Sequence, residues 1–331
     1  MAARETIVIL GSGALAHDVV RTLVAEAADR RIVVVEIKKG TGTDFFPVKN
    51  QGLPAAVPCL DPSSPACARE LCDLLLELRP AVLALTCLSE SPVTPAEPWV
   101  SDIAITTSVT SALTRLVELG GQPPHVLLLS STAVYGVAPA SPLVFDEQSA
   151  LPRETVFASA CARWAQELRN CERRIVAWAV GAEAGVGVLR TASVFGGAQR
   201  AGASARAPLA GAMDSPLAAM LRARLPIRVL GYDPPCQVVH YEDLVRAVAL
   251  AIDQRCGEVL NIVGRSVIPL SRLFAMAGIV APAVPGPIAD RIAPSATDGA
   301  HLRWRTLADG RRATALLGFQ PQKTLEECFG G

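Results

Sequence analysis

The glycine-rich stretch VILGSGALAHDVV (8–20) has the residue types and spacing of a phosphate-binding loop, because a β-branched run, two glycines and a helical pattern follow one another. Gly11 and Gly13 would let the backbone turn tightly and approach a pyrophosphate, and Ala16 would let the helix lie close to the sheet. Amides at the helix amino terminus would then bind the phosphates. The pattern predicts a dinucleotide site, and the alternative is an ordinary tight turn between strand and helix. The predicted site consists of Gly11, Ser12, Gly13, Ala14, Leu15 and Ala16.

Charged residues that follow the next two predicted strands are candidates for binding the adenosine half of such a cofactor. Glu36 ends the run RIVVVE, where a carboxylate would accept hydrogen bonds from the ribose hydroxyls and favour NAD. Lys38 and Lys39 follow at once and would instead meet the 2′-phosphate of NADP, so NADH and NADPH both stay open. Asp61, in VPCLDP (57–62), follows a further short strand expected between the predicted strands 31–35 and 81–86, and it is a candidate for binding adenine. The alternative roles are a solvated strand end for the first three residues and an Asp-Pro turn for Asp61.

These residues need a scaffold of alternating strands and helices, and the first 190 residues have that pattern. Short apolar runs predict buried strands, and an apolar face at helical spacing predicts each helix between them. The predicted strands are 6–10, 31–35, 81–86, 125–130 and 185–190, and the predicted helices are 14–28, 68–78, 101–119 and 157–168. A further helix at 241–253, a strand at 259–263 and a helix at 311–317 follow. The alternation predicts an α/β fold with a doubly wound, Rossmann-type parallel sheet.

The composition excludes several classes of partner. The chain has 31 basic and 31 acidic residues, a net charge of zero and no basic run, which argues against nucleic acid and anionic membrane surfaces. No apolar run approaches the length of a membrane span and the amino terminus does not resemble a signal peptide, so we expect a cytoplasmic protein. Nine cysteines without a CxxC pair are typical of a reduced protein with buried thiols, and no metal site is predicted.

The stretch HVLLLSSTAVYG (125–136) is the most informative part of the sequence, because a buried strand runs into Ser-Ser-x-x-Val-Tyr-Gly. Five further stretches follow it in order: PLVFDEQSALP (142–152), VLRTASVFG (188–196), VVHYEDLVRAVALAI (238–252), VLNIVG (259–264) and LLGFQPQKTLEE (316–327). The ordered set resembles the extended short-chain dehydrogenase/reductase family, the NAD-dependent epimerases and dehydratases, over nearly the whole chain. The resemblance implies a Rossmann domain at 1–190 to which 238–263 returns. It also implies a smaller substrate lobe formed by 191–237 and 264–331, with a lid near 198–216.

The resemblance also implies positions for the catalytic residues. Ser131 would hydrogen-bond the substrate carbonyl, with Thr132 as the nearest second hydroxyl, and its alternative role is to cap the strand end. The Tyr-x-x-x-Lys pair of the family should begin 26 residues after that serine, where this sequence has Phe157, with Cys161 in the lysine position. One helical turn separates these two positions, so they would lie on the same face of the helix, as the tyrosine and lysine of the family do. The phenol and the amine of that pair are both absent. None of the three tyrosines, at 135, 232 and 241, has a lysine four residues later.

The two replacements remove the proton donor of the family. A tyrosine hydroxyl has a pKa of about 10 and acts as general acid once a lysine lowers that pKa. Phe157 cannot transfer a proton, and Cys161 is expected to be a small apolar filler or a titratable thiol. A third departure lies before His240, because Cys236 and Gln237 stand where many nucleotide-sugar enzymes of the family have an arginine that binds the substrate diphosphate. His240 itself is expected to be structural.

Three functions are compatible with this pattern. The first is an NAD(P)H-dependent ketoreductase for an apolar or aromatic ketone, in which a neighbouring phenol of the substrate, or solvent, supplies the proton. It resembles the atypical ketoreductases of aromatic-polyketide antibiotic pathways that lack this tyrosine, angucyclinone 7-ketoreductases among them. The second is a nucleotide-sugar epimerase-like isomerase with another acid–base pair, such as Glu147 and His240. The third is a non-catalytic dinucleotide sensor. The resemblance further implies a homodimer formed through the regions 101–119 and 157–170.

Overall fold

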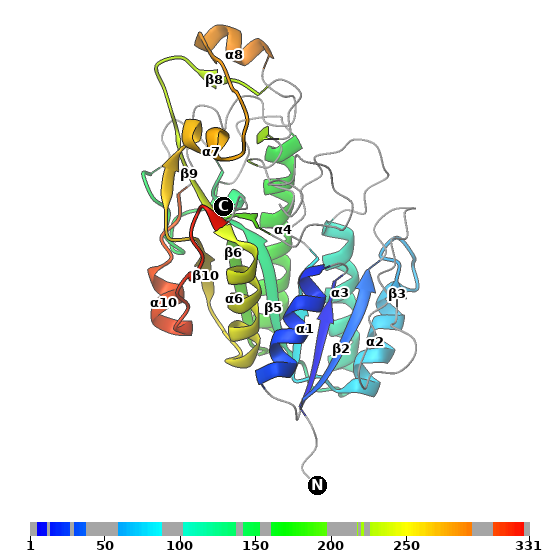
Figure 1. Cartoon of the computed structure of the whole chain (residues 1–331). Helices are drawn as coiled ribbons and strands as arrows, with labels where there is room; N and C mark the ends of the chain where they lie inside the picture. Colours follow the sequence, from blue (N-terminus) through cyan, green and yellow to red (C-terminus); the bar gives the residue numbers. More distant parts are fainter. Residues whose placement is uncertain are drawn as a thin grey trace.

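Aliphatic and β-branched runs of the sequence form a parallel sheet with helices on both faces, and a smaller lobe lies beyond the carboxyl ends of the strands (Figure 1). The computed structural model describes residues 5–11, 14–26, 30–37, 59–87, 102–136, 142–152, 160–196, 217, 220–221, 226–292 and 307–327. The side chains of 160, 161 and 290 are not among the parts described. Ser12, Gly13, Lys38 and Phe157 and the predicted lid at 198–216 lie outside the described residues.

The main sheet has seven strands in the order β10-β6-β5-β4-β1-β2-β3, and all neighbouring pairs are parallel. The strands are β1 (Thr6–Leu10), β2 (Arg31–Ile37), β3 (Cys59–Leu60), β4 (Val82–Leu85), β5 (His125–Ser131), β6 (Val186–Thr191) and β10 (Val259–Ile262). After β3 the chain crosses to the other side of β1, and this reversal of direction creates a topological switch point between β1 and β4. The predicted Rossmann-type fold is therefore confirmed.

Two groups of helices cover the sheet. On one face, α1 (Ala14–Glu26) packs against α6 (Tyr241–Asp253), and on the other α3 (Asp102–Glu118) lies between α2 (Cys67–Leu78) and α4 (Ala160–Gly181) (Figure 1). The helix predicted at 157–168 continues to Gly181, because Cys171, Ile175 and Ala179 extend its buried face beyond the predicted end. None of the described helices is both long and apolar enough to cross a bilayer.

The carboxyl-terminal part forms a second, smaller hydrophobic core around Phe195, Leu273 and Phe274. Its elements are β7 (Ser193–Phe195), β8 (Arg228–Val229), β9 (Pro235–His240), β11 (Val267–Pro269), β12 (Ala283–Val284), α7 (Leu270–Met276) and α8 (Gly286–Ile292). The last helix, α10 (Arg311–Leu317), instead packs near β10 and α6. The predicted boundaries after 190, 237 and 263 stay predictions, although β10 and α6 do belong to the layers of the main sheet.

Candidate cofactor and substrate site

The switch point brings the first glycine of the predicted loop against the end of β4. The Gly11 amide donates a hydrogen bond to the Val35 carbonyl, so the chain stays paired with β2 for one residue beyond the end of β1. A Cβ atom built on Gly11 would lie 2.2 Å from Thr86 Oγ1, well inside contact distance. Thr86 is buried and its hydroxyl lies 3.4 Å from the Leu10 carbonyl oxygen. Glycine is therefore required here by packing alone, before any ligand is considered.

The helix that follows is placed as a phosphate-binding helix would be. Helix α1 begins at Ala14, which is exposed, whereas Leu15 and Ala16 are buried. Ala16 has no exposed surface, in agreement with the prediction that a small residue lets this helix approach the sheet. The carboxyl edge of the sheet at a switch point is the usual ligand site of doubly wound folds. The roles of Ala14, Leu15 and Ala16 toward a dinucleotide stay predictions.

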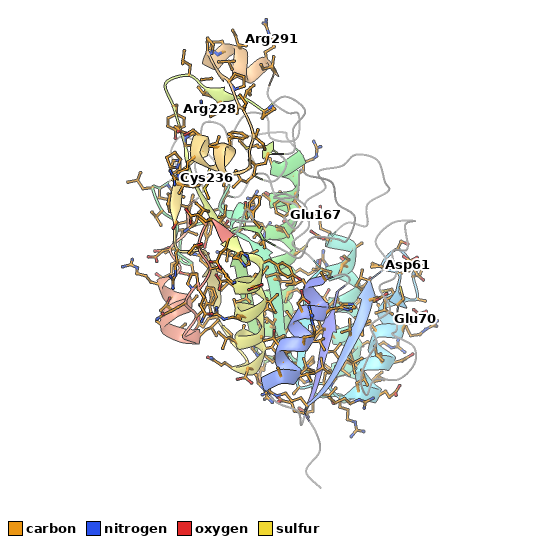
Figure 2. All side chains as sticks on the ribbon, in the orientation of Figure 1. Asp61, Glu70, Glu167, Arg228, Cys236 and Arg291 are labelled. Atoms are coloured by element: carbon orange, nitrogen blue, oxygen red, sulfur yellow. The ribbon has the colours of Figure 1, made fainter. Side chains whose placement is uncertain are left out.

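The two acidic candidates lie at the carboxyl ends of the next strands. Glu36 is half-buried in β2 and pairs with Cys59 of β3. Asp61 follows β3 directly, and its carboxylate accepts a hydrogen bond from the Ser63 amide at 3.0 Å. That bond forms the turn before α2, and the role of Asp61 toward adenine stays a prediction. Figure 2 labels Asp61 close to β3, at the far end of the sheet from β10.

Ser131, the predicted substrate-binding serine, ends β5 and begins a short 3₁₀ helix, η1 (Thr132–Tyr135). Its Oγ accepts a hydrogen bond from the Ala133 amide at 3.2 Å, so it caps that helix. The capping bond uses only a lone pair of the hydroxyl, and the proton on Oγ stays free to be donated to a carbonyl. Both Ser131 and Thr132 are 8% exposed. Ser131 can therefore cap η1 and donate a hydrogen bond to a substrate carbonyl at the same time.

Helix α4 holds η1 in place through two buried charged side chains that the sequence did not single out. Glu172 accepts from Ser130 Oγ at 2.5 Å and forms an ion pair with Arg190 at 2.7 Å. Arg169 donates to the Val134 carbonyl at 2.9 Å, and burial lowers the pKa of its guanidinium to about 10. Ser131 and Thr132 lie between these two anchor points, so α4 fixes their backbone. Both residues follow the predicted end of this helix at 168, so the apolar spacing of the sequence did not indicate them.

The hydroxyls of both buried tyrosines are engaged. Tyr135 donates to Asn261 Oδ1 at 2.8 Å and accepts from Arg190 at 3.1 Å, with its ring stacked on Phe145. Burial raises the pKa of the Tyr135 phenol, although the charge of Arg190 offsets part of the rise. Tyr241 donates to Asp18 of α1 at 2.8 Å, and burial and that carboxylate raise its pKa. Neither phenol is available to protonate a substrate.

Glu147 and His240, the acid–base groups considered for the epimerase alternative, both accept hydrogen bonds from backbone amides. Glu147 accepts from the Asn261 amide at 2.8 Å. His240 caps α6, because its Nδ1 accepts from the Glu242 amide at 3.1 Å, and the prediction of a structural histidine is confirmed. A Cβ atom on Gly196 would lie 2.3 Å from His240 Nε2, so the ring is also enclosed from the other side. Both groups serve the fold.

The remaining predicted positions lie on α4 and β9. Cys161 is the second residue of α4, and only its backbone is described. Cys236 lies in β9, which Figure 2 places in the lobe. Burial, with Asp233 nearby, raises the pKa of the Cys236 thiol to about 12. The thiol is therefore neutral and offers no positive charge to a diphosphate. Among the described residues, no group of three or more metal-ligating side chains is close enough to hold a metal ion.

Comparison with known proteins supports the fold. No family model and no curated protein matches the sequence. Among solved structures, MoeE5 in complex with UDP-glucuronic acid and NAD is 22% identical with a TM-score of 0.58, over 98% of this chain and 96% of that chain. UDP-glucose 4-epimerase of Thermus thermophilus in complex with NAD is 16% identical with a TM-score of 0.64, over the same shares. WbmG of Bordetella bronchiseptica with NAD and UDP is 15% identical with a TM-score of 0.64, over 100% and 93%. At these identities the likeness is one of fold.

Proposed function

We propose that this protein is an atypical NAD(P)H-dependent ketoreductase that reduces a carbonyl of an apolar, aromatic polyketide-type substrate without a catalytic tyrosine. The dinucleotide would lie at the switch point, with its pyrophosphate over Gly11 and the amino terminus of α1. Three structural neighbours of the same fold were solved with NAD bound, which supports the choice of cofactor. Glu36 would accept hydrogen bonds from the adenosine ribose. Both NADH and NADPH are tested as the cofactor.

The observation that carries the proposal is the position of the tyrosines. Tyr135 and Tyr241 have their hydroxyls bonded to Asn261 and Asp18. Tyr232 lies in the turn after β8 and is partly exposed, within the lobe rather than at the end of β5. Position 157 is a phenylalanine, and both buried phenols among the described residues have their hydroxyls bonded to other side chains. A reductase built on this site would obtain its proton from the substrate or from water.

The residues of the chain would then bind and orient rather than donate the decisive proton. A bound nicotinamide supplies hydride to the carbonyl carbon. Ser131 would donate its hydroxyl to the carbonyl oxygen and hold it in line, with Thr132 beside it. The oxygen gains negative charge as hydride arrives, and a phenol adjacent to the carbonyl on the substrate would pass its proton to that oxygen. The resulting phenolate then regains a proton from water, so the balance closes without an enzyme acid.

The test measures consumption of NADH and NADPH by the purified protein with matched ketones. One substrate is an aromatic ketone with a peri-hydroxyl group, and its control is the same compound with that hydroxyl methylated. We expect turnover of the first and a loss of about a hundredfold or more on the second, the scale of general acid catalysis. Equal turnover of both compounds would refute the substrate as proton source. Phe157→Tyr should raise the rate on the hydroxylated ketone little, because its proton is already in place.

The two alternatives give different results in the same experiment. Saturable binding of the dinucleotide without turnover of any ketone would favour the sensor. Interconversion of a UDP-sugar without net consumption of NADH would favour the epimerase, which the engaged positions of Glu147 and His240 oppose. Tyr241→Phe is a further control: it removes one hydrogen bond to Asp18, and ketone turnover should persist.

A further inference from the structure

A hollow of about 780 Å³ lies across the outer faces of α2, α3 and α4, and it shares no residue with the candidate cofactor and substrate site. Figure 1 shows these three helices on the face of the sheet opposite α1 and α6. The hollow forms because the exposed side of α3 carries the small residues Ser111 and Thr114. Longer side chains on the neighbouring helices, Arg69 of α2 and Trp178 of α4, form its walls.

The hollow is positively charged. Arg69, Arg115 and Arg174 line it from three different helices, and Glu118 is the one acidic residue of the lining. All three arginines are exposed. Across the described ranges, none of them forms an ion pair. Arg115 does reach the buried Cys72 thiol, but burial raises the pKa of that thiol and keeps it neutral.

The hollow gathers three exposed arginines from three helices and only one acidic residue, Glu118. The chain has equal numbers of basic and acidic residues. Some other described arginines pair with acids, as Arg30 does with Asp253 and Arg312 with Glu258, and others do not, so the close grouping of the three is what distinguishes the hollow. A guanidinium is suited to bind carboxylates through paired hydrogen bonds, and Trp178, which is half-buried, adds an apolar contact surface. We propose that this three-helix groove binds an acidic segment of a partner protein.

Two other occupants fit the groove less well. A single small anion would fill a fraction of a 780 Å³ hollow and could not use charges that come from three helices at once. A second copy of the chain, related by a two-fold axis through the groove, would set the same patch against itself. Arginines would then face arginines, and like charges across an interface oppose association. That repulsion applies to an axis through the groove, and the region 157–170 of the homodimer implied by the family resemblance contains none of the residues that line it.

The test is fluorescence anisotropy with a labelled peptide in which glutamates alternate with alanine and leucine. A second peptide carries glutamine at every glutamate position. We expect the acidic peptide to bind about tenfold more tightly or better, and the difference to shrink as salt is added. The triple variant Arg69→Glu, Arg115→Glu, Arg174→Glu should lose about tenfold or more in affinity. Its control is Arg31→Glu, Arg272→Glu, Arg291→Glu, which changes the net charge equally at exposed arginines outside the groove and should stay within about threefold.

Four results would overturn the proposal. Equal loss in both triple variants would mean a general charge effect, and equal binding of the two peptides would mean that carboxylates are not recognised. Displacement of the acidic peptide by inorganic phosphate at a similar molar concentration would indicate a small-anion site. A dimer in sedimentation equilibrium that dissociates only in the groove variant would assign the groove to a second copy. Circular dichroism checks folding, and if the triple variant does not fold, the single changes Arg69→Gln, Arg115→Gln and Arg174→Gln should each weaken binding about two- to fourfold.

Discussion

Gly11 is required by packing and is proposed to be required by the cofactor, and a double-mutant cycle can separate the two demands. Gly11→Ala would place a methyl group 2.2 Å from Thr86 Oγ1, 3.4 Å from Thr86 Cβ and 3.6 Å from the Cys87 amide nitrogen. Only the first distance is a clash, since the other two are ordinary contacts. Thr86 is buried and β-branched, so its side chain has little freedom to turn away. We expect Gly11→Ala to lower the free energy of unfolding by about 1–3 kcal/mol, as overpacking does.

Thr86→Ala removes the atom that clashes. Alone, it should cost about 1 kcal/mol, because it loses a long hydrogen bond to Leu10 and leaves a small cavity. In the double variant the new methyl group faces Thr86 Cβ, now an alanine Cβ, at 3.4 Å. The double variant should therefore be no less stable than Thr86→Ala, with a coupling energy of about 1–3 kcal/mol. Urea unfolding followed by circular dichroism measures all three variants.

The cofactor demand is tested on the same proteins by isothermal titration with NADH and NADPH. If the backbone at Gly11 approaches a pyrophosphate, the methyl group blocks that approach whether or not Thr86 is present. The double variant should then regain stability and still bind the dinucleotide about tenfold more weakly or worse. A stable Gly11→Ala protein would refute the steric reasoning. Unchanged dinucleotide affinity in the double variant would refute the assignment of Gly11 to the phosphates.

Three further predictions concern the scaffold. Glu172→Gln should lower the free energy of unfolding by about 3–5 kcal/mol in urea titrations, because Arg190 is left buried without its carboxylate; Glu258→Gln, at an exposed pair, should change it by less than about 1 kcal/mol. Burial lowers the pKa of His125, so the unfolded chain takes up a proton that the folded chain does not, and stability should fall as the pH drops through about 6.5. His125→Gln should flatten that slope, and equal slopes would contradict the assignment. The Asp243 carboxylate accepts hydrogen bonds from the Gln322 and Lys323 amides at 2.9 and 3.0 Å. Asp243→Ala should therefore speed hydrogen exchange at these two amides, whereas Asp253→Ala should leave their exchange unchanged.

Local patterns were sufficient for the scaffold because strands and helices follow the spacing of apolar residues. The helix predicted at 241–253 and the one at 311–317 have the observed bounds, and each predicted strand lies within a residue or two of its observed limits. In the layers of the main sheet the exception is α4, whose second half carries Arg169, Glu172, Arg173 and Arg174 and therefore has a polar pattern; the short elements of the lobe were not predicted. Two of these charges are buried, Glu172 against β5 and β6 and Arg169 against η1, and only partners distant in the sequence offset the cost of that burial.

The sequence alone determined which groups the candidate site can contain: a glycine loop after the first strand, a serine at the end of the fifth, and no Tyr-x-x-x-Lys pair. These are facts of composition and order, and folding cannot add a missing hydroxyl. The tertiary structure decided which of the remaining groups are free to react. Tyr135, Tyr241, Glu147 and His240 all carry titratable atoms, and each is bonded to a residue or amide that the fold brings beside it. Except at His240, those partners lie more than a hundred residues away along the chain. The sequence alone shows that the tyrosine and lysine of the family are replaced. That none of these four groups is free to take over their role depends on contacts that only the folded chain makes.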